Sequence, residues 1–248
     1  MIGKRIIQLG PIDSTNEYLI KQFNDKAELV HGEVFVSQEQ LVGKGQGSNL
    51  WESEPGKNLT FSVFLLPSFL QADEQFYLNM AISLGVYDFV SGIVKENSVN
   101  LKWPNDIYVD NKKVGGILIS HSISGLDFLY TIVGIGLNIN QNKFISDAPN
   151  PASLSQFLEE ELDLEICLKQ LLSNINGRFQ QLEDKKNELI KTDYLNALLG
   201  YKVWRNYIYN SQKIKAKIIG ISRYGTLQLI DDQDERFECD FKEIEFTF

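Results

Sequence analysis

Short connections between strand-like runs are the feature that most limits how this chain can fold. Runs rich in β-branched and aromatic residues lie at 34–37, 59–66, 107–109, 114–120 and 128–135. The third and fourth runs are joined by DNKK, and the fourth and fifth by SISGLD. Because parallel neighbours need a crossover of about a dozen residues or more, these connections predict antiparallel pairs. The sequence therefore predicts a mostly antiparallel sheet.

Two segments between and after these runs have helical periodicity. Segment 74–96 carries apolar residues at helical spacing, and a later stripe suggests a second long helix, opened by a capping-box pattern from Ser153 to Gln156. The stripe consists of Leu164, Leu168, Leu171, Ile175, Phe179 and Leu182. Helices packed on an antiparallel sheet define an α+β fold class.

The pattern after Gly200 is entirely β. Four strand-like runs follow, with turns at Asn210-Ser211, at Tyr224-Gly225 and at the acidic run 231–235. This part predicts a small β-barrel appended to the larger unit. We therefore expect two domains, 1–199 and 200–248.

Composition excludes several classes of protein. The net charge is −9, and neither the part before Tyr201 nor the part after it has an excess of basic residues, which argues against a nucleic-acid partner. Cys167 and Cys239 lack metal-site spacing and are expected in the core. The N-terminus lacks the apolar region of a signal peptide, and no membrane span is expected, so the sequence predicts a cytoplasmic protein without a membrane partner.

The strongest candidate for chemistry is a glycine-rich loop. In VSQEQLVGKGQGSNLWES a strand runs into Gly43, Gly45 and Gly47, and such glycines let a phosphate or carboxylate approach the backbone. The loop lacks the GK[ST] ending of a phosphate-binding P-loop and the helix that follows a dinucleotide fingerprint. An ordinary flexible loop is the alternative interpretation.

Three further segments carry polar residues beside glycines or turns. In LKWPNDIYVDNKKVGGILIS, Asn105 and Asp106 begin a hairpin and could hold Mg²⁺-phosphate, whereas a lysine pair near a turn is more often a solvated edge. VGIGLNIN could line a ligand or form a β-bulge. In DSTNEYL, Ser14 and Thr15 could simply cap a helix.

Taken together and in order, these segments resemble the catalytic domain of biotin protein ligases. STN, a GxGxGxxxW loop, KWPND, KxGGIL and GIGxNxN are similar to the motif series of that family, and GISRYGTLQLI resembles a strand pair of its small C-terminal domain. The similarity covers nearly the whole chain. It implies a class II synthetase-like catalytic domain followed by an SH3-like barrel.

The resemblance also implies substrates and residue roles. ATP, Mg²⁺ and biotin as a substrate are expected, with Lys113 and Asp106 as catalytic residues and Asp106 as a ligand of the magnesium ion. The biotin site would contain Ser14, Thr15, Gln40, Gly43, Lys44, Trp51, Gly116, Ile117, Leu118, Gly134 and Gly136. ATP and the adenylate would lie beside Lys44, Gln46, Lys102, Asn105, Asp106, Lys113 and Asn138.

The resemblance predicts a reaction in two halves and a protein partner. Biotin would be activated as biotinyl-5′-AMP and then transferred to a lysine of a biotin carboxyl carrier protein. A lipoate ligase and a catalytically silent biotin-binding protein are the alternatives, although no RRxSGGG-like run is present. The oligomeric state is left open, a homodimer being one option.

Two departures from the family pattern affect these expectations. Gln46 stands where the family often has an arginine, which can grip phosphate bidentately, and Lys44 is the obvious compensating cation. Strand-like residues begin almost at Ile6, which leaves no room for the DNA-binding helices that some family members carry, so we expect no repressor function.

Overall fold

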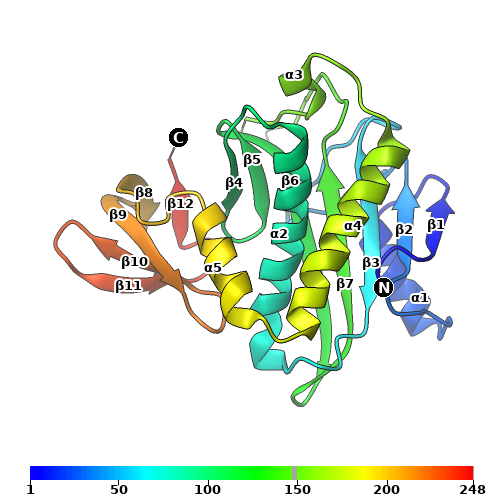
Figure 1. Ribbon diagram of the computed structural model, residues 1–248, viewed down its shortest axis with the longest axis horizontal. Helices are drawn as coiled ribbons and strands as arrows, with labels where there is room; N and C mark the ends of the chain where they lie inside the picture. The colour runs from blue at the N-terminus through cyan, green and yellow to red at the C-terminus, as the bar shows by residue number, and fades with distance from the viewer. Residues whose placement is uncertain (147–149, 248) are drawn as a thin grey trace.

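A seven-stranded sheet forms the centre of the molecule in this computed structural model, which describes residues 1–146 and 150–247. Its order is β1-β2-β3-β7-β6-β5-β4, and β1 pairs with β2 in parallel while the other neighbours are antiparallel (Figure 1). The expected mostly antiparallel sheet is confirmed. The strands are β1 (Ile6–Leu9), β2 (Val34–Ser37), β3 (Leu59–Leu65), β4 (Val99–Lys102), β5 (Asp106–Val109), β6 (Lys112–Ser124) and β7 (Asp127–Leu137).

The hairpins β5–β6 and β6–β7 follow the predicted turns. Asp110 and Asn111 both have positive φ, as a two-residue hairpin turn requires. The register pairs β5 only with residues 112–116 of β6, whereas β7 pairs along almost the whole of β6. From Ile117 onward, β6 therefore has a strand neighbour on one side only.

Helices cover both faces of this sheet. Helix α1 (Thr15–Asn24) contacts β3 and β7 over a small cluster of buried residues that includes Leu19, Phe64 and Ile132. Helices α2 (Gln75–Ile93), α4 (Leu164–Glu183) and α5 (Asn187–Ala197) pack together over the opposite face (Figure 1). Gly85 lets α4 come close, because a Cβ there would lie 2.6 Å from the Ile175 Cα.

The apolar stripe of α4 is confirmed, but the capping box expected before it is wrong. The short helix α3 (Ser155–Leu158) has Leu154 at its N-cap and no side-chain cap. Ser153 Oγ instead lies 3.1 Å from Ser155 Oγ. α4 begins later and is capped by Asp163, whose carboxylate accepts from two backbone N–H groups.

By length and composition one helix among the described residues could cross a membrane. This helix, Ala72–Ile93, consists of the short helix η1 (Ala72–Glu74) and α2. Of its most apolar 18-residue stretch, 61% is buried inside the fold. α2 stands between α5 and α4 and contacts β4 and β5 of the large sheet (Figure 1). It is therefore the central helix of the hydrophobic core, and core helices pass the same length test.

The C-terminal part forms a second, five-stranded antiparallel sheet in the order β11-β10-β9-β8-β12. Its strands are β8 (Arg205–Tyr209), β9 (Gln212–Ile221), β10 (Leu227–Asp231), β11 (Arg236–Cys239) and β12 (Ile244–Phe246). The expected small β unit after the α+β unit is thus present. The domain boundary at residues 199 and 200 stays a prediction.

The loop between β9 and β10 holds the two sheets together. Trp103 Nε1 donates a hydrogen bond of 3.0 Å to the Gly225 carbonyl, and Arg223 pairs with Asp73 at 2.6 Å. Gly225 has φ +94°, and a Cβ there would collide with the Phe76 ring. These contacts fix the second sheet against the end of the first, where the candidate site lies.

Candidate active site

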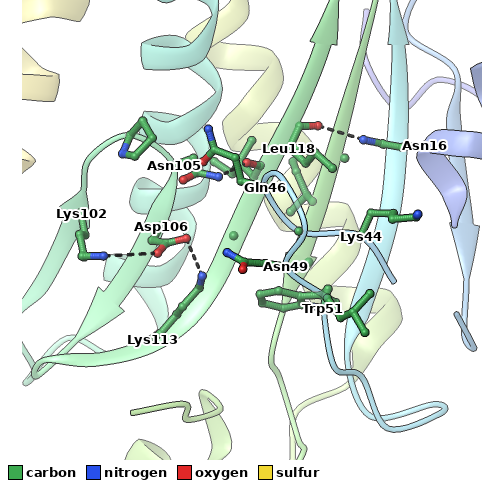
Figure 2. Close-up of a pocket in the computed structure, with 18 of the residues that line it drawn as sticks. Asn16, Lys44, Gln46, Asn49, Trp51, Lys102, Asn105, Asp106, Lys113 and Leu118 are labelled. Carbon is green, nitrogen blue, oxygen red and sulfur yellow. Dashed lines mark hydrogen bonds and ion pairs between the residues drawn. The ribbon is translucent and has the colours of Figure 1, made fainter. Parts of the chain in front are cut away.

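A cavity of about 270 Å³, here called the main cavity, opens between α1, β6, β7, the glycine-rich loop and β12 (Figure 2). It brings together most of the residues that the sequence singled out. Those lining it are Ser14, Thr15, Gln40, Lys44, Gln46, Trp51, Lys102, Asn105, Asp106, Lys113, Gly116, Ile117, Leu118, Gly134 and Gly136.

Gly43 and Asn138 lie outside the lining of this cavity. A Cβ at Gly43 would come within 2.5 Å of the Trp51 carbonyl oxygen. Glycine is therefore needed at this position, where the Gly43 carbonyl accepts a hydrogen bond from the Trp51 backbone N–H. The Asn138 amide donates to the Ala152 carbonyl at 3.1 Å and is buried. Both residues thus have contacts within the protein, and their predicted roles at the ligand stay predictions.

One end of the main cavity is a network of neutral polar side chains. Gln40 Oε1 accepts hydrogen bonds from the Thr15 backbone N–H at 2.8 Å and from Thr15 Oγ1 at 3.2 Å. Gln40, rather than Ser14, therefore caps α1, since the Ser14 side chain makes no capping bond. Ser62 Oγ binds Thr15 Oγ1 at 2.7 Å and Asn16 Oδ1 at 2.5 Å. The Gln40 amino group and the Ser14 hydroxyl remain to hydrogen-bond a polar ligand.

We expect Gln40→Glu to weaken biotin binding while leaving thermal stability unchanged. Glutamate keeps an oxygen that can cap α1 but loses the amino group, and a buried ligand group left without its partner costs about 1–3 kcal/mol. Calorimetric titration with biotin measures this loss. Gln38→Glu, on an exposed neighbouring position, is the control. Unchanged biotin affinity in Gln40→Glu would show that Gln40 only caps the helix.

The wall of the main cavity is made of glycines that face larger side chains. Cβ atoms at Gly134 and Gly136 would collide with Asn16 and with the Trp51 indole, and a Cβ at Gly116 would lie 3.3 Å from the same indole. Trp51 Nε1 is buried and makes no hydrogen bond within the described structure. The glycines thus let the indole lie flat on β6 and β7, where it forms an apolar cover with a free donor.

Gly136→Ala is expected to lower biotin affinity by displacing Trp51. Overpacking of this kind costs about 1–3 kcal/mol. Titration with biotin, combined with the fluorescence of the tryptophans, follows affinity and indole position together. Gly92→Ala, at a helical glycine with nothing within 4 Å of the added Cβ, is the matched control. Normal affinity in Gly136→Ala would mean that Trp51 does not cover the ligand.

The other end of the main cavity is charged. Lys113 Nζ lies 2.7 Å from Asp106 Oδ1 and 5.8 Å from the centroid of the Trp51 ring, and Lys102 Nζ lies 3.9 Å from Asp106 Oδ2 (Figure 2). Burial lowers the pKa of Lys102, and the carboxylate of Asp106 partly opposes that effect. One carboxylate is thus shared by two largely buried ammonium groups, which hold positive charge at this end.

Lys44 and Gln46 occupy different places around the glycine-rich loop. Lys44 Nζ pairs with Glu17 at 3.3 Å, and its side chain points away from Asp106 (Figure 2). Gln46 lies beside Asn105 and Leu118, and its Oε1 is buried without a hydrogen-bond partner among the described residues (Figure 2). Gln46, although neutral, therefore lies in the wall beside Asn105, whereas Lys44 lines the main cavity with its ammonium group paired to Glu17 and does not take the place of the missing arginine in this arrangement.

Several lining residues were not predicted from the sequence. Asn16, which belongs to the STN motif, donates to the Leu118 carbonyl at 3.1 Å and so could have been suspected. The others include Asn49 in the glycine-rich loop and Phe241, Lys242, Ile244 and Phe246 at the C-terminus. The C-terminal residues match no motif, and only the folded chain shows that β12 and the turn before it reach the main cavity.

The residues present supply little of a magnesium site by themselves. Within residues 1–146 and 150–247 no group of three or more His, Cys, Asp or Glu side chains could hold a metal ion. Asp106 is the one carboxylate in the lining, and both of its oxygens face lysines. Mg²⁺ often binds proteins through one or two carboxylates together with substrate phosphates, so Asp106 could hold it only jointly with the triphosphate.

Comparison with known proteins identifies the family of this chain. The model of the "Biotin/lipoate A/B protein ligase family" matches residues 10–138, which include α1, the glycine-rich loop and β3 to β7. The chain belongs to this family. The expectation of an enzyme of the ligase class is therefore confirmed.

Relatives with similar sequences cover almost the whole chain. Biotin–protein ligase 2 of Arabidopsis thaliana is 30% identical over 247 residues, which are 95% of this chain and 72% of that protein. The bifunctional ligase/repressor BirA of Bacillus subtilis is 27% identical over 240 residues, 94% of this chain and 69% of that protein. Both are similar to this ligase-family chain in its two β units as well as its helices.

A solved structure of the family shows the same fold. The biotin protein ligase from Aquifex aeolicus in complex with biotin and ATP has a TM-score of 0.79 and 25% sequence identity, and the match covers 98% of this chain and 100% of that one. The α+β class II synthetase-like fold with a small C-terminal β unit, which the resemblance implied, is thereby confirmed.

Proposed function

We propose that this chain is an ATP-dependent biotin protein ligase, which activates biotin as biotinyl-5′-AMP and transfers it to a lysine of a biotin carboxyl carrier protein. One observation carries the proposal. The glycine-walled main cavity has four lysines and one carboxylate among its described lining residues, two of the lysines beside that carboxylate, in a chain whose net charge is −9. A local excess of ammonium groups suits two anionic substrates, and family membership supports biotin and ATP.

The neutral end of the main cavity would receive the head of biotin. The ureido group needs both donors and acceptors, which Ser14, Thr15 and Gln40 provide, and the apolar ring would lie against Trp51 and Leu118. The carboxylate tail would then extend toward Lys113. This orientation puts the reactive end of biotin beside the charged residues.

In the first half of the reaction a biotin carboxylate oxygen attacks the α-phosphorus of ATP, and pyrophosphate leaves. Both reactants are anions, so positive charge at the meeting point lowers the barrier. Lys113 would touch the carboxylate and the α-phosphate, with Lys102 behind it. A magnesium ion bound by the triphosphate and Asp106 would supply further positive charge.

In the second half the amine of the acceptor lysine attacks the acyl carbon, and AMP leaves. Asp106 is the carboxylate of the main cavity that could orient that amine and accept its proton. A cytoplasmic location, where ATP and the carrier protein are available, belongs to the same proposal.

The deciding experiment compares acyl substrates. The protein is incubated with ATP and a carrier domain, together with radiolabelled biotin or radiolabelled lipoate, and acid-stable label on the carrier is counted. We expect label from biotin. Label from lipoate alone would overturn the proposal in favour of a lipoate ligase, and binding of biotin without label on any protein would indicate a silent binding protein.

A further inference from the structure

A second cavity of about 220 Å³, here called the side cavity, adjoins the main cavity. The two share a common wall made of Gln46, Pro104, Asn105, Ile117 and Leu118. The side cavity lies where β6 has no strand neighbour beyond Ile117, between the glycine-rich loop and the first turns of α2. It is therefore a separate approach to the same ligand space.

The two cavities differ in charge. The residues that line only the side cavity are neutral, and the polar ones are Gln75, Asn79, His121 and Tyr224. Burial lowers the pKa of His121 to about 4, so its imidazole is uncharged at neutral pH. The main cavity, by contrast, is lined by four lysines. An approaching ammonium group is repelled at the main cavity but meets only neutral acceptors in the side cavity.

The wall between the cavities carries an unused acceptor. Gln46 Oε1 is buried and has no hydrogen-bond partner among the described residues, although Gln46 lines both cavities. Beside it, the Asn105 amide donates to the Ile117 carbonyl at 2.6 Å, which fixes the Asn105 side chain in the wall (Figure 2). A buried oxygen without a donor is costly, and an incoming N–H group would satisfy it.

We propose that the side cavity receives the side chain of the acceptor lysine. This inference rests on the proposed function and adds a separate route for the second substrate. The lysine gives up its ammonium proton to solvent water at the mouth, passes Tyr224 and Asn79, and presents a neutral amine at Gln46. The nitrogen then attacks the acyl carbon of the adenylate; a C–N bond forms, the bond from that carbon to the phosphate oxygen breaks, AMP leaves, and one amine proton passes to Asp106.

The uncharged lining of the side cavity favours the form of the acceptor lysine that can react. The amine can attack only after deprotonation, and neutral surroundings out of water favour the uncharged form of a lysine. The adenylate meanwhile stays beside the lysines of the main cavity. Activation thus takes place among the lysines of the main cavity, whereas the acceptor lysine for transfer arrives through the neutral side cavity on the other side of the shared wall.

The test separates the two half-reactions in Asn79→Lys, which adds a fixed ammonium to the side cavity. Wild-type protein must first form labelled adenylate, and failure there would contradict the proposed function rather than this inference. In Asn79→Lys we expect unchanged pyrophosphate release but transfer to the carrier domain slowed about tenfold or more, because like charges repel. Asn196→Lys, at an exposed position on α5 outside both cavities, is the matched control.

Two further measurements keep the result interpretable. Preformed adenylate is treated with hydroxylamine, a small neutral nucleophile. The rate at which hydroxylamine consumes the adenylate should be the same in the variant and the wild type if the acyl site is intact. Tyr224→Lys, at a residue that is 69% exposed, repeats the test at the mouth. Normal transfer in both lysine variants would overturn the proposal, as would hydroxylamine reactivity that falls in parallel with transfer.

Discussion

Replacing Lys113 by alanine is expected to abolish adenylate formation while leaving biotin affinity nearly intact. Its ammonium group lies 2.7 Å from Asp106 at the charged end of the main cavity, far from the neutral network around Gln40. Losing one electrostatic contact of this kind costs about 10²–10³ in rate. Release of pyrophosphate in single turnovers measures the loss, and calorimetric titration measures biotin binding.

The neighbouring lysine is the control for this variant. Lys112 is exposed, lies outside the main cavity and has its Nζ 5.9 Å from the Phe157 ring centroid. Lys112→Ala should therefore release pyrophosphate at the wild-type rate. Near-normal release in Lys113→Ala, or a biotin-affinity loss larger than its rate loss, would contradict the role given to Lys113.

Asp106→Asn is expected to have the opposite selectivity, with transfer more impaired than activation. The amide keeps the shape of the carboxylate but cannot take a proton, and a positioned base contributes about 10²–10⁴ in rate. Lys102 and Lys113 are both retained in this variant, so the two lysines that serve activation are still present beside residue 106. The two half-reactions are followed by pyrophosphate release and by label on the carrier domain.

Asp127→Asn provides the comparison for the loss of a carboxylate. Asp127 is exposed at the start of β7 and lies outside the main cavity, so this variant should behave as wild type. If Asp106→Asn transfers biotin at the normal rate, another group must deprotonate the acceptor lysine. If it loses both half-reactions equally, Asp106 acts mainly by holding Lys113.

The sequence predicted the sheet well because its information is local. The alternation of residues and the short turns around 110–113 and 122–127 determine β5, β6 and β7, and the helical spacing determines α2 and α4. The capping box at Ser153 failed because a serine three residues before a glutamine is common, and tertiary contacts decide whether a helix begins there. Gln40 illustrates the reverse case, since it caps a helix distant in sequence.

The site was only partly predictable for a related reason. Motifs identify residues such as Lys113 and Asp106, which contact each other across a hairpin, but they do not indicate which wall each side chain faces. Lys44 pairs with Glu17, while Gln46 turns inward, and nothing in the spacing of the glycines distinguishes these orientations. Lys242 lines the main cavity from a region without any motif.

The presence of the turn before β12 in the wall of the main cavity has a thermodynamic consequence. No disulfide joins the two sheets, since Cys167 and Cys239 are both free thiols, and a bound substrate would touch both sheets at once. Ligand binding free energy is then added to the stability of the junction itself. A filled cavity works as a reversible cross-link, so that the small C-terminal sheet should melt together with the large one when substrate is bound and ahead of it when the cavity is empty.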